Sequence, residues 1–135
     1  MLKHFWYTVL WLVVLTILSL LPGNDIPTSN WLEQIHADKI VHVGMYAMLT
    51  FLLLLSMSHW KKKEFSHWRK AFPFIIFAMS YGVSMELMQL FFTDSRKFEV
   101  ADMVANAGGA FIGFFVFRFF SKILAKNKGQ HMLPQ

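Results

Sequence analysis

The fold is decided by the stretch from Gly82 to Gly113, which reads GVSMELMQLFFTDSRKFEVADMVANAGGAFIG. Two apolar helical runs flank a short polar link, and polar side chains lie in the link or near it. These side chains are Glu86, Gln89, Arg96, Asp102 and Asn106. A carboxylate at the centre of a lipid-spanning helix costs about 2.5–3.5 kcal/mol on insertion scales. We therefore expect these groups on a protein-facing surface, which marks a site without naming its chemistry.

The composition of the whole chain is that of a membrane protein. The 135 residues, enough for one domain, are 56% hydrophobic, with 15 Phe and a mean hydropathy of +0.43. Only 16% are charged, against about 25% in soluble domains. The net charge of +5 could suggest nucleic acid, but no motif supports that partner, and basic clusters in so apolar a chain mark the cytosolic ends of spans. The lack of cysteine excludes disulfides and thiol chemistry.

Four apolar runs are long enough to cross a bilayer at about 1.5 Å rise per residue. They are Phe5–Leu21, Ile40–Trp60, Ala71–Phe92 and roughly Met103–Ser121. A signal peptide is the alternative for the first run, but no A-x-A-like cleavage site follows it. We predict an all-α, polytopic four-transmembrane-helix bundle: residues 1–125 form a single membrane domain, and 126–135 form a disordered cytosolic tail.

The link before the second run contains helix breakers. Pro22-Gly23 and Pro27 interrupt it, and Asn30 followed by Glu33 has the spacing of a capping box. A short helix from Trp31 to His36 and a solvated loop are both compatible with this pattern.

The distribution of Lys and Arg predicts the orientation. Ten of the 13 lie in the N-terminus, the 61–70 link, Arg118 and the tail, whereas Lys39, Arg96 and Lys97 lie in the other two links. By the positive-inside rule both termini are then cytosolic. The positive-inside effect accounts for the Lys61–Lys63 run, so we assign it no binding role. Of the eight acidic residues only Glu64 lies on the cytosolic side, and a polar outward-facing site would explain that asymmetry.

Three predicted spans carry a polar stripe at helical spacing. The stripes are Asp38, His42 and Tyr46; Gly82, Glu86 and Gln89; and Asp102, Asn106, Gly109 and Gly113. The orientation brings all three to the outer third of the bilayer. Each residue has a simpler interpretation: Tyr46 alone suits an interfacial aromatic belt, His42 alone suits packing, and the glycines, with Ala105, suit close helix contact. The whole set could also be a structural hydrogen-bond network.

Other chemistries fit the sequence less well. His42, Glu86 and Asp102 are possible metal ligands, but no H-E-x-x-H motif or second close histidine pair accompanies them. We therefore predict neither a metal nor another cofactor. Ser80, Ser84 and Ser95 lack a nucleophile elbow, which argues against a catalytic triad.

These motifs resemble the VanZ-like family of small bacterial membrane proteins. The resemblance runs from the first span to the end of the fourth. It rests on Asp38-Lys39-x-x-His42-x-x-x-Tyr46, Gly82-x-x-x-Glu86-x-x-Gln89, Arg96, Asp102-x-x-x-Asn106 and Gly109-x-x-x-Gly113. It implies an integral protein of the bacterial envelope. The founding member is linked to low-level resistance to the glycopeptide teicoplanin, but membership implies no settled reaction.

Two functional hypotheses follow. In the first, an outward-facing pocket in the bacterial cytoplasmic membrane binds or modifies a lipid-linked or peptidoglycan-related molecule. Glu86 and His42 would act as acid and base, and Arg96 would orient an anionic headgroup. The other binding residues would be Asp38, Tyr46, Gln89, Asp102 and Asn106. In the second hypothesis the chain is a non-enzymatic accessory protein that holds a membrane protein partner, and its polar set is structural.

Overall fold

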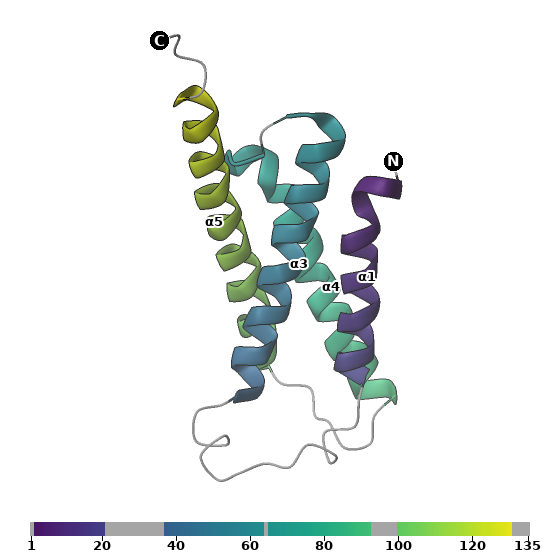
Figure 1. Ribbon diagram of the computed structural model, residues 1–135. Helices are drawn as coiled ribbons and strands as arrows, with labels where there is room; N and C mark the ends of the chain where they lie inside the picture. Colours follow the sequence, from purple (N-terminus) through teal and green to yellow (C-terminus); the bar gives the residue numbers. More distant parts are fainter. Residues whose placement is uncertain (1, 21–36, 64, 93–99, 131–135) are drawn as a thin grey trace.

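The protein is a bundle of antiparallel helices, seen in a computed structural model that describes residues 2–20, 37–63, 65–92 and 100–130. The helices of this part are α1 (Leu2–Leu20), α3 (Ala37–Lys61), α4 (Trp68–Phe92) and α5 (Val100–Gln130). All four are long and apolar enough to cross a membrane, and they run alternately up and down (Figure 1). The predicted all-α, four-span architecture is confirmed.

The helices extend beyond the apolar runs that predicted them. α3 begins three residues before Ile40 and α4 three residues before Ala71. α5 continues through Gln130, so residues 126–130 are helical where the sequence predicted a disordered tail. Lys126, Lys128 and Gln130 are good helix formers, so the helix continues past the apolar pattern although Asn127 and Gly129 disfavour it. The rest of that tail, and residues 31–36, for which a short helix and a loop were both compatible with the sequence, lie outside the described residues.

The turn after α3 uses a left-handed residue. Lys62 has a φ of 51° directly after the last helical residue, Lys61, which is a common way to end a helix. α4 then starts from His67, whose carbonyl accepts hydrogen bonds from the amides of Lys70 and Ala71 at 3.0 and 3.1 Å. This tight connection makes α3 and α4 antiparallel neighbours.

α3 is the central helix and packs against each of the others, most extensively against α5. Gly109 and Gly113 of α5 permit this approach. A Cβ at either position would overlap the backbone of α3, at the carbonyl oxygens of Val43 and Ala47 respectively. The two contacts are spaced four residues apart on both helices, as in the small-residue helix interfaces of membrane proteins. The glycines thus serve helix packing, the simpler of the two interpretations that the sequence allowed.

The core is apolar, and so is much of the outer surface. Fully buried residues such as Leu15, Leu49 and Phe114 fill the interior. Large apolar side chains also cover the outside of the bundle, for example Ile17 on α1 and Phe119 on α5. A soluble protein rarely exposes apolar patches of this extent, whereas lipid chains cover them in a membrane.

The topology separates the bundle into two ends. The start of α1, the end of α3, the start of α4 and the end of α5 lie at one end, which we call the basic end (Figure 1). The start of α3, the end of α4 and the start of α5 lie at the other, which we call the polar end. The three polar stripes therefore meet at one end, and the identification of that end as non-cytosolic remains a prediction.

Candidate functional site

Three helices bring one polar side chain each into contact near the polar end. Nδ1–H of His42 on α3 donates to Oδ1 of Asn106 on α5 at 2.9 Å. Nδ2–H of Asn106 donates to Oε1 of Glu86 on α4 at 3.5 Å. His42 Nδ1 and Glu86 Oε1 are 4.0 Å apart. We call His42, Glu86 and Asn106 the polar cluster, in which the Asn106 amide bridges the imidazole and the carboxylate.

The polar cluster lies inside the bundle. His42 is the sixth residue of α3, Asn106 is the seventh of α5, and Glu86 is seventh from the end of α4. At 1.5 Å per residue these positions are about 8–9 Å from the helix ends. Glu86 and Asn106 are each 1% exposed, and His42 is 6% exposed. Buried polar groups need partners, and here each helix supplies one to the others.

A more open rim connects the polar cluster to the surface. Lys39 Nζ lies 3.3 Å from Asp102 Oδ1 and 2.8 Å from Asp38 Oδ2. The exposed fraction of the side chain rises from 1% at Glu86 to 13% at Asp102, 26% at Lys39 and 57% at Asp38. These three rim residues therefore form a charged path from the surface toward the buried carboxylate. Asp38 lies at the outer end of that path because it is in the first turn of α3.

Tyr46 lies in the core and not in an interfacial aromatic belt. Its side chain is fully buried, and Gly82 of α4 makes room for it. A Cβ at position 82 would lie 3.2 Å from Tyr46 Cε1 and 3.1 Å from Asn106 Cβ. Within the described residues the Tyr46 hydroxyl has no hydrogen-bond partner. A buried hydroxyl without a partner is costly.

The remaining predicted residues have different surroundings. Gln89 Nε2–H donates to the carbonyl oxygen of Ser19 at 2.7 Å, so this amide joins α4 to α1. Arg96 lies outside the described residues, and so does Lys97.

Lys39 stands in the Asp38-Lys39-x-x-His42 motif, but it was not among the predicted site residues. The sequence suggested Arg96 as the cation, because it lies in the link between the two polar runs. The signal for Lys39 was its place in the first turn of α3, three residues before His42, which puts it on the same helix face.

The alternative metal ligands do come together. Ligand atoms of His42, Glu86 and Asp102 lie within 4.8 Å of one another. Ligands of a tetrahedral zinc ion at about 2.0–2.2 Å lie about 3.4 Å apart, so these side chains would have to move closer together by up to about 1.4 Å. However, the ammonium group of Lys39 already lies beside Asp102. A fixed positive charge at that position competes with a metal cation for the carboxylate.

Comparison with known proteins identifies the family. No curated protein and no solved structure matches the chain. The sequence profile of the family described as VanZ/LLP1 matches residues 4–121, which include the polar cluster and the rim. The match extends from the first turn of α1 to Ser121 in α5. This multi-pass membrane protein therefore belongs to the VanZ/LLP1 family.

Proposed function

We propose that the protein resides in the bacterial cytoplasmic membrane and that its polar cluster binds a lipid-linked or peptidoglycan-related molecule at the non-cytosolic face. Glu86 and His42 would exchange a proton with that molecule if it is modified. The observation that carries the proposal is the convergence of His42, Glu86 and Asn106 from three helices on one buried point.

The burial of Glu86 supports a functional role. A carboxylate is expensive within a membrane-spanning helix, and such residues commonly mark functional sites. The imidazole of His42 lies 4.0 Å from this buried carboxylate, so a proton would pass between them through a bound molecule or one water. Asn106 hydrogen-bonds both groups and so fixes their positions relative to each other.

An anionic ligand would depend on the cations near the rim, because the rim itself carries two carboxylates, Asp38 and Asp102, against one ammonium group, Lys39. Lys39 offers an ammonium group between the surface and the polar cluster, and Arg96 would add a second cation by the sequence hypothesis. Phosphate or pyrophosphate groups of lipid-linked envelope precursors suit such cations. The link to teicoplanin tolerance rests on family analogy alone. It provides a phenotype that can be measured.

A structural role for the cluster is the second candidate, and other contacts favour it. Thr8 and Ser56 share a buried hydrogen bond of 2.9 Å, and Thr16 and Tyr81 share a partly buried one of 2.5 Å. The chain therefore uses interhelical hydrogen bonds to fix its packing outside the polar cluster as well. An accessory protein that holds a membrane partner would need only such contacts.

The substitution Glu86→Gln separates the two candidates. A Gln oxygen can still accept the hydrogen bond from Asn106, so the fold should persist while the charge is lost. Ser84→Ala is the matched control, because Ser84 is exposed on the same helix and its hydroxyl donates to the backbone carbonyl oxygen of Ser80. Each variant is expressed in a strain lacking its own VanZ-family proteins. Teicoplanin tolerance, bound lipid-linked precursors by native mass spectrometry, and thermal unfolding in detergent are measured.

The proposal predicts that Glu86→Gln loses tolerance and precursor binding while its unfolding temperature stays close to that of Ser84→Ala. Unchanged tolerance and binding in a folded Glu86→Gln protein would reject the functional role. A lowered unfolding temperature, together with a stoichiometric membrane partner that co-purifies with the wild type, would favour the accessory role.

A further inference from the structure

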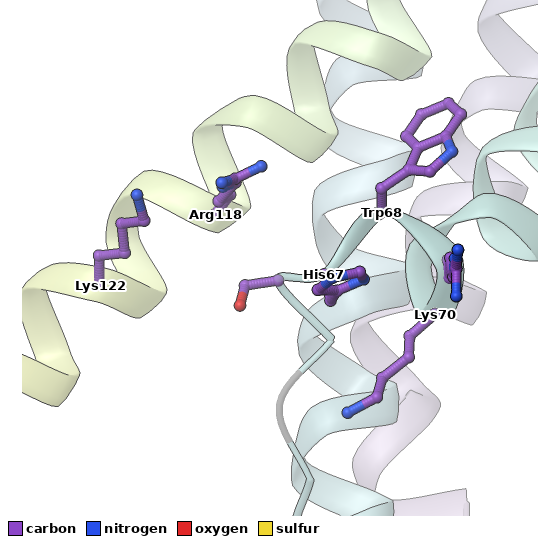
Figure 2. Close-up of a pocket in the computed structure, with 7 residues that line it drawn as sticks. His67, Trp68, Lys70, Arg118 and Lys122 are labelled. Atoms are coloured by element: carbon purple, nitrogen blue, oxygen red, sulfur yellow. The ribbon is translucent and has the colours of Figure 1, made fainter.

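A cavity of about 560 Å³ lies at the basic end, far from the polar cluster. Its walls come from the start of α4 and from the second half of α5. Figure 2 shows Arg118 and Lys122 on one helix, across the cavity from His67 and Trp68 at the start of the other. The lining residues are Ser66, His67, Trp68, Arg69, Lys70, Arg118 and Lys122.

The cavity is strongly basic. Four of its seven lining residues are Lys or Arg, a fifth is His, and none is acidic. The described carboxylates, Asp38, Glu86 and Asp102, all lie at the polar end. In the described part of the chain, no carboxylate pairs with Arg118 or Lys122. A hollow lined by one sign of charge concentrates ions of the opposite sign.

Arg118 indicates that the anion belongs to the membrane. It lies inside the membrane-spanning segment Val100–Leu124, one helical turn before Lys122. Phe115, one turn on the other side, is 60% exposed, and the adjacent Phe119 is 63% exposed. A guanidinium among lipid-facing phenyl rings is costly unless it reaches the interface or an anion. A phospholipid offers both an anionic group and acyl chains to cover the rings.

Trp68 forms a rigid wall of the cavity. Its ring stacks on Phe111 with centroids 5.9 Å apart and an interplanar angle of 10°, and it meets Phe114 edge-on at 5.9 Å. Tryptophan is enriched at the headgroup level of membranes. The cavity also adjoins the N-terminus of the 25-residue helix α4, whose dipole favours an anion. The cavity thus combines lipid-facing phenyl rings, an interfacial Trp and two neighbouring cations.

We propose that this cavity binds the phosphate group of an anionic phospholipid, with Arg118 and Lys122 as its principal contacts. Arg118 would hold the phosphate oxygens through its planar fork, Lys122 would add a point charge, and the acyl chains would lie along Phe115 and Phe119. This lipid site is separate from the polar cluster and does not depend on the function proposed for it.

The test measures lipid binding by native mass spectrometry of the whole protein in detergent. The probes are dioleoyl phosphatidylglycerol, dioleoyl phosphatidylcholine and inorganic phosphate. The test variant is the double substitution Arg118→Gln/Lys122→Gln. The control, Lys62→Gln/Lys63→Gln, removes the same charge from exposed residues at the same end but outside the cavity. Arg118→Lys keeps the charge but loses the fork.

We expect the wild type and the control to bind phosphatidylglycerol in preference to phosphatidylcholine. The double variant should bind it at least about tenfold more weakly, as expected for the loss of charge-assisted hydrogen bonds, with Arg118→Lys between the two. An equal loss in the control would show general attraction to the basic end and overturn the proposal. So would the absence of a preference between the lipids, or competition by millimolar inorganic phosphate, which would indicate a site for free anions.

Discussion

The two ends of the bundle handle charge in opposite ways. At the polar end, charged and polar side chains from three helices lie inside the protein and bond to one another, with the 1% exposed Glu86 as the innermost group. At the basic end, Arg118 and Lys122 line an open cavity without a carboxylate partner among the described residues. The first arrangement makes the local packing depend on each polar group. The second leaves the cations available to molecules from outside and should contribute little to folding.

The largest effect should come from the glycine contact next to the polar cluster. Gly109→Ala and Gly113→Ala each place a Cβ onto the α3 backbone, so the helices must separate. We expect each to lower the free energy of unfolding by about 3 kcal/mol, despite a helix-propensity gain of about 1 kcal/mol. Unfolding in detergent, followed by tryptophan fluorescence, measures this.

Gly108→Ala is the matched control for this prediction. A Cβ at position 108 meets nothing within 4 Å, so only the gain in helix propensity applies, and the variant should be as stable as the wild type or slightly more stable. Equal stability of the three alanine variants would contradict the close α3–α5 contact.

A smaller effect is expected when the bridge of the polar cluster is removed. Asn106→Leu keeps a similar volume but deprives both His42 and Glu86 of their amide partner. We expect a loss of about 1–3 kcal/mol in the free energy of unfolding. Lys63→Gln, an exposed change at the basic end, should stay within about 0.5 kcal/mol. If the two variants proved equally stable, the contrast between the ends would be wrong.

The smallest effect should come from the rim. Its charged side chains are partly exposed, as the cations of the basic end are. Lys39→Gln removes the ion pairs to Asp38 and Asp102. These groups are partly exposed, so we expect a loss below about 1 kcal/mol that shrinks further as salt is added. Unfolding at low and high sodium chloride tests this, and a large loss that salt does not reduce would indicate that the rim is buried.

The overall fold and the meeting point of the polar stripes could be predicted from the sequence. Long uncharged runs have few folded solutions other than membrane-spanning helices, and helical spacing places His42, Glu86 and Asn106 on defined faces. The orientation rule then assigns them to one end. These steps use only local periodicity and the order of the spans.

The specific partners could not be predicted, because they depend on contacts between distant segments. Tyr46 is in the core because Gly82, on another helix, makes space for its ring. Gln89 bonds to α1, although its spacing put it on the face of Glu86. The basic cavity forms only because the start of α4 and the second half of α5 lie side by side. Neither segment carries a sequence motif that predicts this contact.

The glycine contact has a consequence for how a molecule could reach the polar cluster. α3 and α5 touch backbone to backbone at Gly109 and Gly113, so His42 and Asn106 lie on the most closely packed pair of helices. Glu86 belongs to α4, which lacks such a contact with either helix among the described residues. We therefore expect the cluster to open by a displacement of α4, which would carry the carboxylate away from the imidazole and the amide.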